Sequence, residues 1–133
     1  ITETAAISNI DDAIALMDAL RGIGCRFSLD DFGAGLSSFG YLKRLPVDYL
    51  KIDGSFIREI TTDDVSRSMV EAFCTIGKTM GLSIVAEFVS DKDAVALLRE
   101  IGIDFAQGFG IGKPAPITET IRALKRVRKS ASA

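Results

Sequence analysis

The chain has 133 residues, of which 47% are hydrophobic and 26% are charged, so it is long enough to bury the core of one globular unit. Its net charge of −2 and isoelectric point of about 5.1 provide no basic field for a nucleic-acid backbone, which argues against polymeric DNA or RNA as a partner. No apolar run reaches the roughly 18–20 residues of a membrane-spanning helix, and the first residues lack the layout of a signal peptide. We therefore expect a cytoplasmic chain, although a longer parent protein could be anchored through other segments.

Three long segments have apolar residues at the three- and four-residue spacing of an amphipathic helix. Each begins behind a pattern of Ser or Thr followed three residues later by Asp, which is typical of a helix start. They cover residues 10–20 behind Ser8-x-x-Asp11, 65–80 behind Thr61-x-x-Asp64, and the segment 94–101 behind Ser90-x-x-Asp93. Two further helices are expected over residues 37–45 and 117–124, the second running into a basic tail, 125–129, that we expect to be a solvated helix end.

Between these helices lie segments that are typical of strands: residues 26–30, 48–53, 83–89 and a short one within 104–112. Strict alternation of strand and helix predicts an α/β fold with a parallel sheet and right-handed crossovers. In the second strand, Leu50 and Ile52 point to one face, and Lys51 and Asp53 point to the other. An apolar face toward the helices and polar groups toward the axis are features of a (β/α)8 TIM-like barrel. Since such a barrel usually takes about 250 residues, we predict about half a barrel, its C-terminal half, with the rest before Ile1.

The two cysteines, Cys25 and Cys74, lie in apolar segments without C-x-x-C spacing, and the chain contains no histidine. We therefore expect two buried free thiols rather than a zinc site or a disulfide framework. A metal site in this chain would have to use oxygen ligands.

Polar residues lie at or near the ends of the predicted strands: Asp30, Asp31, Asp53, Glu87 and Gln107. A barrel would bring them together, although the paired aspartates alone could form a simple turn. Lys51 and Asp53 could likewise form an internal ion pair. Glu87 lies in an apolar strand and must be paired, protonated or bound to metal, because desolvating a lone carboxylate costs several kcal/mol.

Carboxylates without His or Cys suit hard cations such as Mg²⁺ or Mn²⁺. Two such ions about 3.5–4 Å apart can activate water and stabilise the attacking and leaving oxygens of a phosphodiester. The glycine-rich segments FGAGLSS and QGFGIGK fit neither a nucleotide P-loop nor a dinucleotide fingerprint. Hydrolysis of a phosphate ester is therefore the reaction class that the residues favour.

Four motifs occur in a fixed order along the chain: ITETAAI, LDDFGAGLSSFGYLKRLPVDYLKIDG, IVAEFV and GIDFAQGFGIGKP. Together they resemble the EAL-domain family of bacterial cyclic-di-GMP phosphodiesterases over nearly the whole chain. The resemblance implies that residues 1–133 are the C-terminal portion of a single EAL domain. It also implies a barrel fold, divalent metal ions and hydrolysis of cyclic di-GMP to linear pGpG.

The resemblance also implies roles for individual residues. Asp30 is similar to the bridging metal ligand and Asp31 to its neighbour on the second metal. Lys51 and Asp53 are similar to the groups that position the attacking water, and Glu87 to the essential strand-end glutamate. Asp53 and Glu87 are also expected among the metal ligands.

Two more residues are expected to act by resemblance, Glu3 as the brace of the loop 32–38 and Gln107 as a contact to a guanine base. The chain departs from the family pattern in other places. The Glu-Ala-Leu signature, an asparagine ligand downstream of it and a glutamate immediately before Ile1 are all expected upstream, so at least three metal ligands lie outside these residues. Ser90 occupies a position at which family members commonly carry a second glutamate.

We therefore expect these 133 residues to be inactive alone and the full-length parent to be the phosphodiesterase. An alternative is a degenerate domain that serves as a cyclic-di-GMP receptor or a protein-interaction module. Because the unpaired edges of a half-barrel invite pairing with another chain, we also expect a homodimer. A sensory or diguanylate cyclase (GGDEF) domain could precede the chain in the parent.

Overall fold

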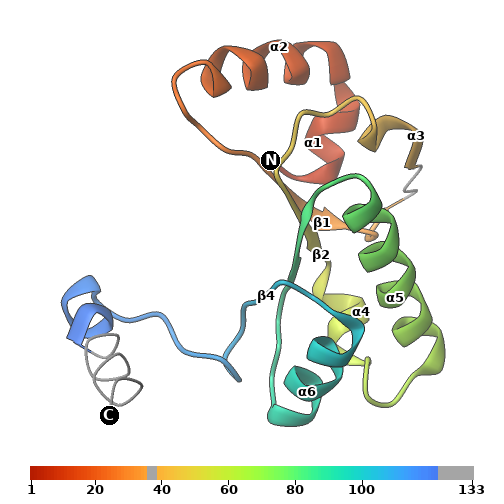
Figure 1. Ribbon diagram of the computed structural model, residues 1–133, viewed down its shortest axis with the longest axis vertical. Helices are drawn as coiled ribbons and strands as arrows, with labels where there is room; N and C mark the ends of the chain where they lie inside the picture. Colours follow the sequence, from red (N-terminus) through yellow and green to blue (C-terminus); the bar gives the residue numbers. More distant parts are fainter. Residues whose placement is uncertain (36–38, 123–133) are drawn as a thin grey trace.

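The computed structural model of the chain describes residues 1–35 and 39–122 (Figure 1). Its strands are β1 (Ser28–Phe32), β2 (Tyr49–Ile52), β3 (Ser83–Ala86) and β4 (Phe105–Ala106). Its helices are α1 (Glu3–Ser8), α2 (Ile10–Arg21), α3 (Phe39–Leu42), α4 (Gly54–Arg58), α5 (Asp64–Thr79) and α6 (Lys92–Ile101). Residues 117–122 are also helical and lie apart from the sheet in Figure 1.

The four strands form one parallel sheet in the order β1-β2-β3-β4, the same as their order in the sequence. Helix α5, in the connection between β2 and β3, packs against both strands. Connections between neighbouring parallel strands are almost always right-handed, which places successive helices on the same face of a sheet. A doubly wound sheet would instead reverse its strand order at a switch point. The observed order is that of a barrel segment, as the sequence predicts.

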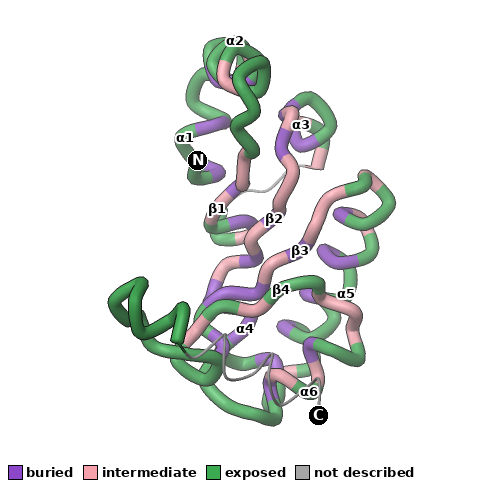
Figure 2. Tube along the Cα trace, turned by 60° about the vertical axis from the view of Figure 1, so that its left-hand side comes forward, coloured by how far each residue is buried: buried purple, intermediate pink, exposed green. Residues whose placement is uncertain are grey.

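Burial alternates along the strands and separates the two faces of the sheet. The side chains that face the helices are almost completely buried, and in the central strands they are Leu50, Ile52, Ile84 and Ala86. Their neighbours Lys51 and Val85 are half-buried on the opposite face. Figure 2 shows this change between buried and intermediate positions along the strands. The predicted apolar face of β2 is confirmed, and Lys51 lies on the opposite face, whereas Asp53 follows the strand. The polar face is where a site can form.

The three long helices occur where they are predicted, but other residues cap them. Asn9, Asp63 and Asp91 cap α2, α5 and α6 through side-chain oxygens that accept backbone N–H groups. These caps lie one or two residues after the predicted Ser8, Thr61 and Ser90, because Asn and Asp are strong caps in their own right. Helix α3 occupies part of the predicted segment 37–45, and residues 36–38 and the tail 125–129 lie outside the described residues.

Both cysteines are free thiols, but only one of them is buried. Cys74 on α5 lies 3.7 Å from the carbonyl oxygens of Ile101 and Gly102. Cys25 is exposed, so its predicted burial was wrong. It lies in the connection between α2 and β1, before the chain reaches the covered part of the sheet.

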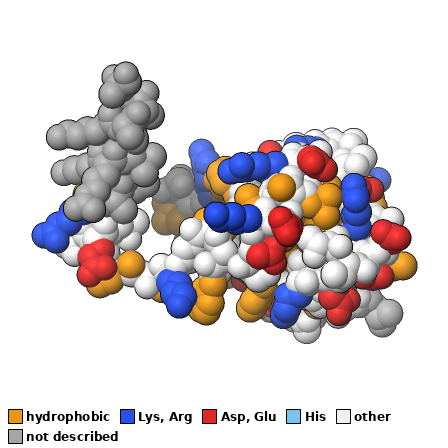
Figure 3. Space-filling model, turned by 90° about the horizontal axis from the view of Figure 1, so that it is seen from below, with side chains coloured by type: hydrophobic (Ala, Val, Ile, Leu, Met, Phe, Trp, Pro, Cys, Tyr) orange, Lys and Arg blue, Asp and Glu red, His pale blue; other side chains and the backbone are white. Residues whose placement is uncertain are grey.

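The surface in Figure 3 carries acidic and basic side chains side by side, without a continuous basic area on that face. A phosphate backbone of DNA or RNA is bound by clustered Lys and Arg side chains. Within the part of the chain that the structure describes, no helix is both long enough and apolar enough to cross a bilayer.

Candidate active site

Strand β1 carries a bulge at its paired aspartates. Its pairing with β2 shifts between Leu29 and Phe32, where β1 has one residue more than β2. Leu29 and Phe32 are fully buried, and Asp31 between them has a left-handed backbone with φ 58°. Because a bulge adds an unpaired residue to a strand, both Asp30 and Asp31 fit between two core residues. The end of β1 thus presents two carboxylates together.

Lys51 of β2 links the ends of the two neighbouring strands. Its Nζ donates a hydrogen bond to Asp30 Oδ1 at 2.7 Å and another to Glu87 Oε1 at 2.5 Å. Glu87 follows directly after β3 and is buried, with 7% of its surface exposed. The buried carboxylate is therefore paired, which is one of the three states that its sequence context predicts. Among the described residues, Lys51 forms its ion pairs with these two groups and none with Asp53.

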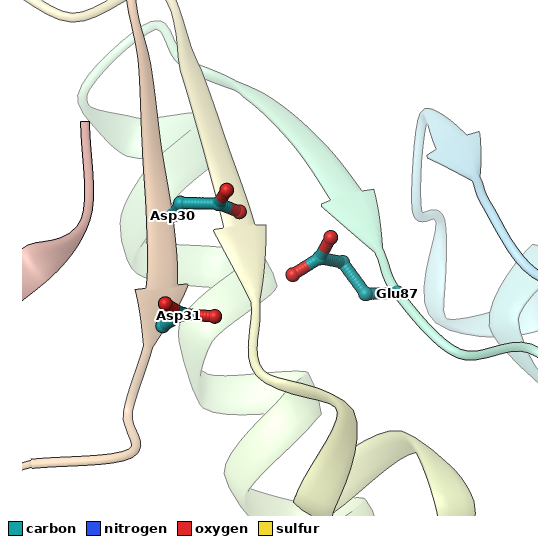
Figure 4. Close-up of side chains that lie close together, drawn as sticks. All are labelled: Asp30, Asp31 and Glu87. Carbon is teal, nitrogen blue, oxygen red and sulfur yellow. The ribbon is translucent and has the colours of Figure 1, made fainter.

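The carboxylates of Asp30, Asp31 and Glu87 converge on the polar face of the sheet. One oxygen of each lies within 4.8 Å of the other two. Figure 4 shows the side chains of Asp30 and Glu87 extending toward each other across β2. Three carboxylate oxygens at this spacing fit a hard divalent cation, and Mg²⁺ usually keeps several waters beside its protein ligands. The residues present can thus hold such an ion.

The network shifts the pKa values of Lys51 and Glu87. Burial lowers the pKa of Lys51, but its hydrogen bonds to Asp30 and Glu87 outweigh burial and raise the pKa above its ordinary 10.5. Burial raises the pKa of Glu87 above its ordinary 4.5, against the lowering effect of the hydrogen bond from Lys51. The charge of Asp30 raises the Glu87 pKa further. Lys51 is therefore a protonated donor at neutral pH rather than a base.

Asp53 comes directly after β2 and caps α4. Its Oδ1 accepts a hydrogen bond from the Ser55 N–H at 2.8 Å. Partial burial would raise the pKa of Asp53, but hydrogen bonds from Ser55 and Gly54 and the charge of Arg58 lower it overall. Asp53 is therefore ionised at the start of α4 and lies outside the set of three converging carboxylates. Its part in binding a metal stays a prediction.

Glu3 connects α1 to the chain after the paired aspartates. It is buried, with 4% of its surface exposed, and its Oε2 accepts a hydrogen bond from the Gly33 N–H at 3.1 Å. Its Oε1 accepts a hydrogen bond from the Tyr41 hydroxyl. Gly33 has a φ of 97°, and a Cβ atom there would lie 2.8 Å from the Phe56 ring. These contacts are made by the residue that the sequence predicts as a brace, and the effect on activity stays a prediction.

A pocket of about 420 Å³ adjoins Glu87 on the side of β4. Its lining consists of Arg58, Glu87, Phe88, Val89, Ser90, Gln107, Gly108 and Phe109. Two backbone hydrogen bonds fix the position of Gln107. Its N–H donates to the Ala86 carbonyl oxygen at 2.8 Å, and its carbonyl oxygen accepts from the Val89 N–H at 3.1 Å. Sequence reasoning identified Gln107 but missed Arg58 and the two phenylalanines. Phe88 and Phe109 lie within two residues of Glu87 and Gln107, whereas no sequence pattern indicates Arg58.

A sequence model described as the EAL domain matches residues 1–114 of the chain. The chain belongs to the EAL-domain family. Among curated proteins, it is 43% identical over 117 residues to the cyclic di-GMP phosphodiesterase PdeB of Shewanella oneidensis. It is 36% identical over 131 residues to the cyclic di-GMP phosphodiesterase PdeF of Escherichia coli. These similarities cover 88% and 98% of the chain, but only 14% and 18% of the two relatives.

Solved EAL structures share the fold of the chain. The EAL domain of Mycobacterium smegmatis DcpA is 35% identical, with a TM-score of 0.86, over 95% of this chain and 56% of that one. The PaMucR phosphodiesterase in complex with c-di-GMP is 38% identical, with a TM-score of 0.84, over 90% of this chain and 49% of that one. The chain thus spans about half the length of these EAL structures. The predicted family and α/β fold, with part of a TIM-like barrel, are confirmed.

Proposed function

We propose that this chain supplies metal-binding and substrate-binding residues of an EAL phosphodiesterase that hydrolyses cyclic di-GMP to linear pGpG. The observation that carries this proposal is the convergence of the Asp30, Asp31 and Glu87 carboxylates within 4.8 Å. The names of the relatives PdeB and PdeF support the choice of cyclic di-GMP as substrate.

Asp30, Asp31 and Glu87, together with Asp53, would hold Mg²⁺ or Mn²⁺. When bound, such ions activate water and stabilise the charge that develops on the phosphodiester oxygens. Lys51 and Asp53 would position the attacking water, Lys51 as a protonated donor and Asp53 as an ionised acceptor. The raised pKa of Lys51 and the lowered pKa of Asp53 support these two states at neutral pH.

Gln107 would contact one guanine base of the substrate, and the pocket beside Glu87 would enclose that base. Its exposed rings, Phe88 and Phe109, suit a flat aromatic ligand, and the Gln107 amide can both donate and accept hydrogen bonds. Glu3 would brace the loop after the aspartates through its bonds to Gly33 and Tyr41.

The test uses the complete gene product that carries these residues. With Mn²⁺ it should convert cyclic di-GMP to pGpG, a chelator should abolish the reaction, and added Mn²⁺ should restore it. The 133 residues alone should release no pGpG, because further metal ligands are expected upstream of Ile1. A complete gene product without activity at any divalent metal concentration would refute the proposal.

A receptor or protein-interaction role is the second candidate, and Ser90 favours it. Ser90 occupies a position where the resembling family commonly has glutamate, and its Oγ donates to Asp91 Oδ2 at 2.7 Å. It therefore adds no carboxylate to the pocket. Calorimetric titration of the complete gene product with cyclic di-GMP distinguishes the two roles. Tight binding without pGpG release would establish the receptor.

We also propose a homodimer in the cytoplasm and a sensory or GGDEF domain elsewhere in the parent protein. The two outer strands of the described sheet, β1 and β4, support association with further protein, because the edge of a sheet can pair with another chain. A relative, MucR of Pseudomonas aeruginosa, is named a bifunctional diguanylate cyclase and phosphodiesterase, which supports the second domain. Light scattering of the complete gene product measures the oligomeric state, and a monomer at micromolar concentration would refute the dimer.

A further inference from the structure

Phe88, the residue after Glu87, has a backbone conformation that bulky residues rarely adopt. Its φ is 54°, in the left-handed region, and 58% of its surface is exposed. Such a conformation persists only where the surrounding structure holds it in place. The contacts of the Phe88 ring therefore also determine how Glu87 leaves β3.

Helix α4 contacts the Phe88 ring with both of its ends. At the first residue, Gly54 lies so close that a Cβ atom there would overlap with the ring. At the last residue, the Arg58 guanidinium carbon lies 4.6 Å from the ring centroid, within the range of a cation–π interaction. The ring is thus held between glycine backbone and a guanidinium group.

Helix α4 is itself anchored to the protein core. Ile57, the residue before Arg58, is 2% exposed and belongs to the core cluster. Asp53 caps the first turn through Ser55, and the charge of Arg58 helps to lower the Asp53 pKa. Among the described residues, Arg58 forms no ion pair that would hold its side chain elsewhere.

We propose that Arg58 is a positioning residue that couples the end of β2 to the end of β3. Its guanidinium packs on the Phe88 ring, a contact that we call the clamp. The clamp stabilises the left-handed backbone at Phe88 and keeps Glu87 directed toward Lys51 and the two aspartates. The same helix fixes Asp53 at its first turn. This inference rests on the proposed function in one respect: the reaction that the Arg58 contact would affect is the hydrolysis of cyclic di-GMP.

The test measures Mn²⁺ affinity by calorimetry in the complete gene product. Arg58→Ala should weaken Mn²⁺ binding about 10-fold, the lower end of what loss of a supporting contact around metal ligands causes. Arg58→Lys should recover part of the loss, since an ammonium group can lie over the ring but cannot stack as a plane. The control Arg67→Ala removes an exposed arginine of α5, paired with Glu71 at 3.1 Å, and should leave the Mn²⁺ affinity unchanged.

A double-variant cycle isolates the ring as the partner of Arg58. If the clamp acts through Phe88, Arg58→Ala should have no further effect on Mn²⁺ affinity in a Phe88→Ala background. Additive losses would overturn the proposal, and so would wild-type affinity in Arg58→Ala.

A metal-independent measurement separates this proposal from the proposed function. The Val89 N–H donates a hydrogen bond to the Gln107 carbonyl oxygen at 3.1 Å. Its hydrogen exchange with solvent should be about 10-fold faster in Arg58→Ala than in the wild type, and the rate should be unchanged in Arg67→Ala. Gly54→Ala should have the same effect, whereas Gly22→Ala at the exposed end of α2 should not. Unchanged Val89 exchange in both α4 variants would overturn the clamp, even in an active phosphodiesterase. A wild type without activity but with these exchange effects would refute only the proposed function.

Discussion

The ends of β1 and β3 bring carboxylates to the same site with the same backbone conformation but different support. Asp31 has a φ of 58° and Phe88 a φ of 54°, so both residues are left-handed. At β1 the residue is an aspartate, whose short polar side chain tolerates this region better than most. At β3 it is a phenylalanine, which does not.

The contacts that stabilise these two left-handed residues also differ. The chain after Asp31 is held by hydrogen bonds from Gly33 and Tyr41 to the buried carboxylate of Glu3. Phe88 is held by packing against α4. The comparison indicates that the support of the β1 end should respond to a change of the Glu3 carboxylate, and the support of the β3 end to a change of shape in α4. Lys51 joins the two ends and should affect both.

Replacement of the proposed metal ligand Asp30 at the end of β1 should have the largest effect. In the complete gene product, Asp30→Asn should lower pGpG release with Mn²⁺ by more than about 100-fold, because an amide cannot neutralise a bound cation. Asp18→Asn makes the same change on the exposed surface of α2 and should leave the rate unchanged. Activity within a few-fold of wild type would remove Asp30 from the site. At the β3 end, Glu87→Gln should be similarly damaging.

Removing the link between the ends should have the next largest effect. In Lys51→Met, Asp30 and Glu87 lose their shared cation, and the free energy of unfolding without metal should fall by about 2 kcal/mol. A fully buried pair would lose more, but 17% of the Lys51 side chain and 37% of the Asp30 side chain are exposed.

Mn²⁺ sharpens that experiment. A bound cation replaces the missing ammonium charge, so Mn²⁺ should restore part of the lost stability of Lys51→Met. Urea denaturation with and without Mn²⁺ measures both effects. Equal metal-free stability of the variant and the wild type would contradict the role of Lys51 as the link.

Local patterns account for the parts of the fold that could be predicted. The long helices α2, α5 and α6 have enough turns to show their period, whereas α1 and α4, with six and five residues, do not. The third strand was predicted to reach residue 89, but β3 ends at Ala86. The prediction extended the strand because the apolar sequence continues to Val89, which is buried although it lies after the end of β3.

The approach of Asp30, Asp31 and Glu87 could be predicted because the C-terminal ends of parallel strands meet at one edge. The bulge in β1 could not be predicted, since it depends on Leu29 and Phe32 both facing the core. The stack of Arg58 on Phe88 joins residues from separate elements, and no pattern in either segment indicates it. Contacts of this kind depend on packing and not on local spacing.

A smaller effect is expected from the polar support of the β1 end. Glu3→Gln keeps the size of the side chain but replaces one acceptor oxygen with an NH₂ group, which cannot accept from Gly33 or Tyr41. Losing one buried hydrogen bond to a charged group should lower the free energy of unfolding by about 1–2 kcal/mol. Glu100→Gln on the exposed surface of α6 is the matched control. Faster exchange of the Gly33 N–H should accompany the loss, and unchanged exchange would contradict the brace.

The smallest expected effects are opposite shifts in two carboxyl pKa values. In the metal-free protein, NMR titration of side-chain carboxyl carbons should find the pKa of Glu87 above 4.5 and that of Asp53 below 3.8. Burial dominates at Glu87, while hydrogen bonds from Ser55 and Gly54 overcome burial at Asp53. An Asp53 that titrates above Glu87 would contradict this assignment.

These shifts contribute to stability with opposite signs. Glu87 binds its proton more tightly in the folded state, so its contribution is present below its unfolded pKa and is lost as pH rises through the folded value. Asp53 contributes above its unfolded pKa, and that contribution is lost as pH falls through the lower folded value. Bound Mn²⁺ should reverse the contribution of Glu87, because a metal binds the carboxylate and not the acid. Urea denaturation between pH 4 and 7 should therefore show metal stabilisation that grows with pH, and in Glu87→Gln that growth should be smaller. An identical pH dependence in Glu87→Gln would show that this carboxylate does not bind the metal.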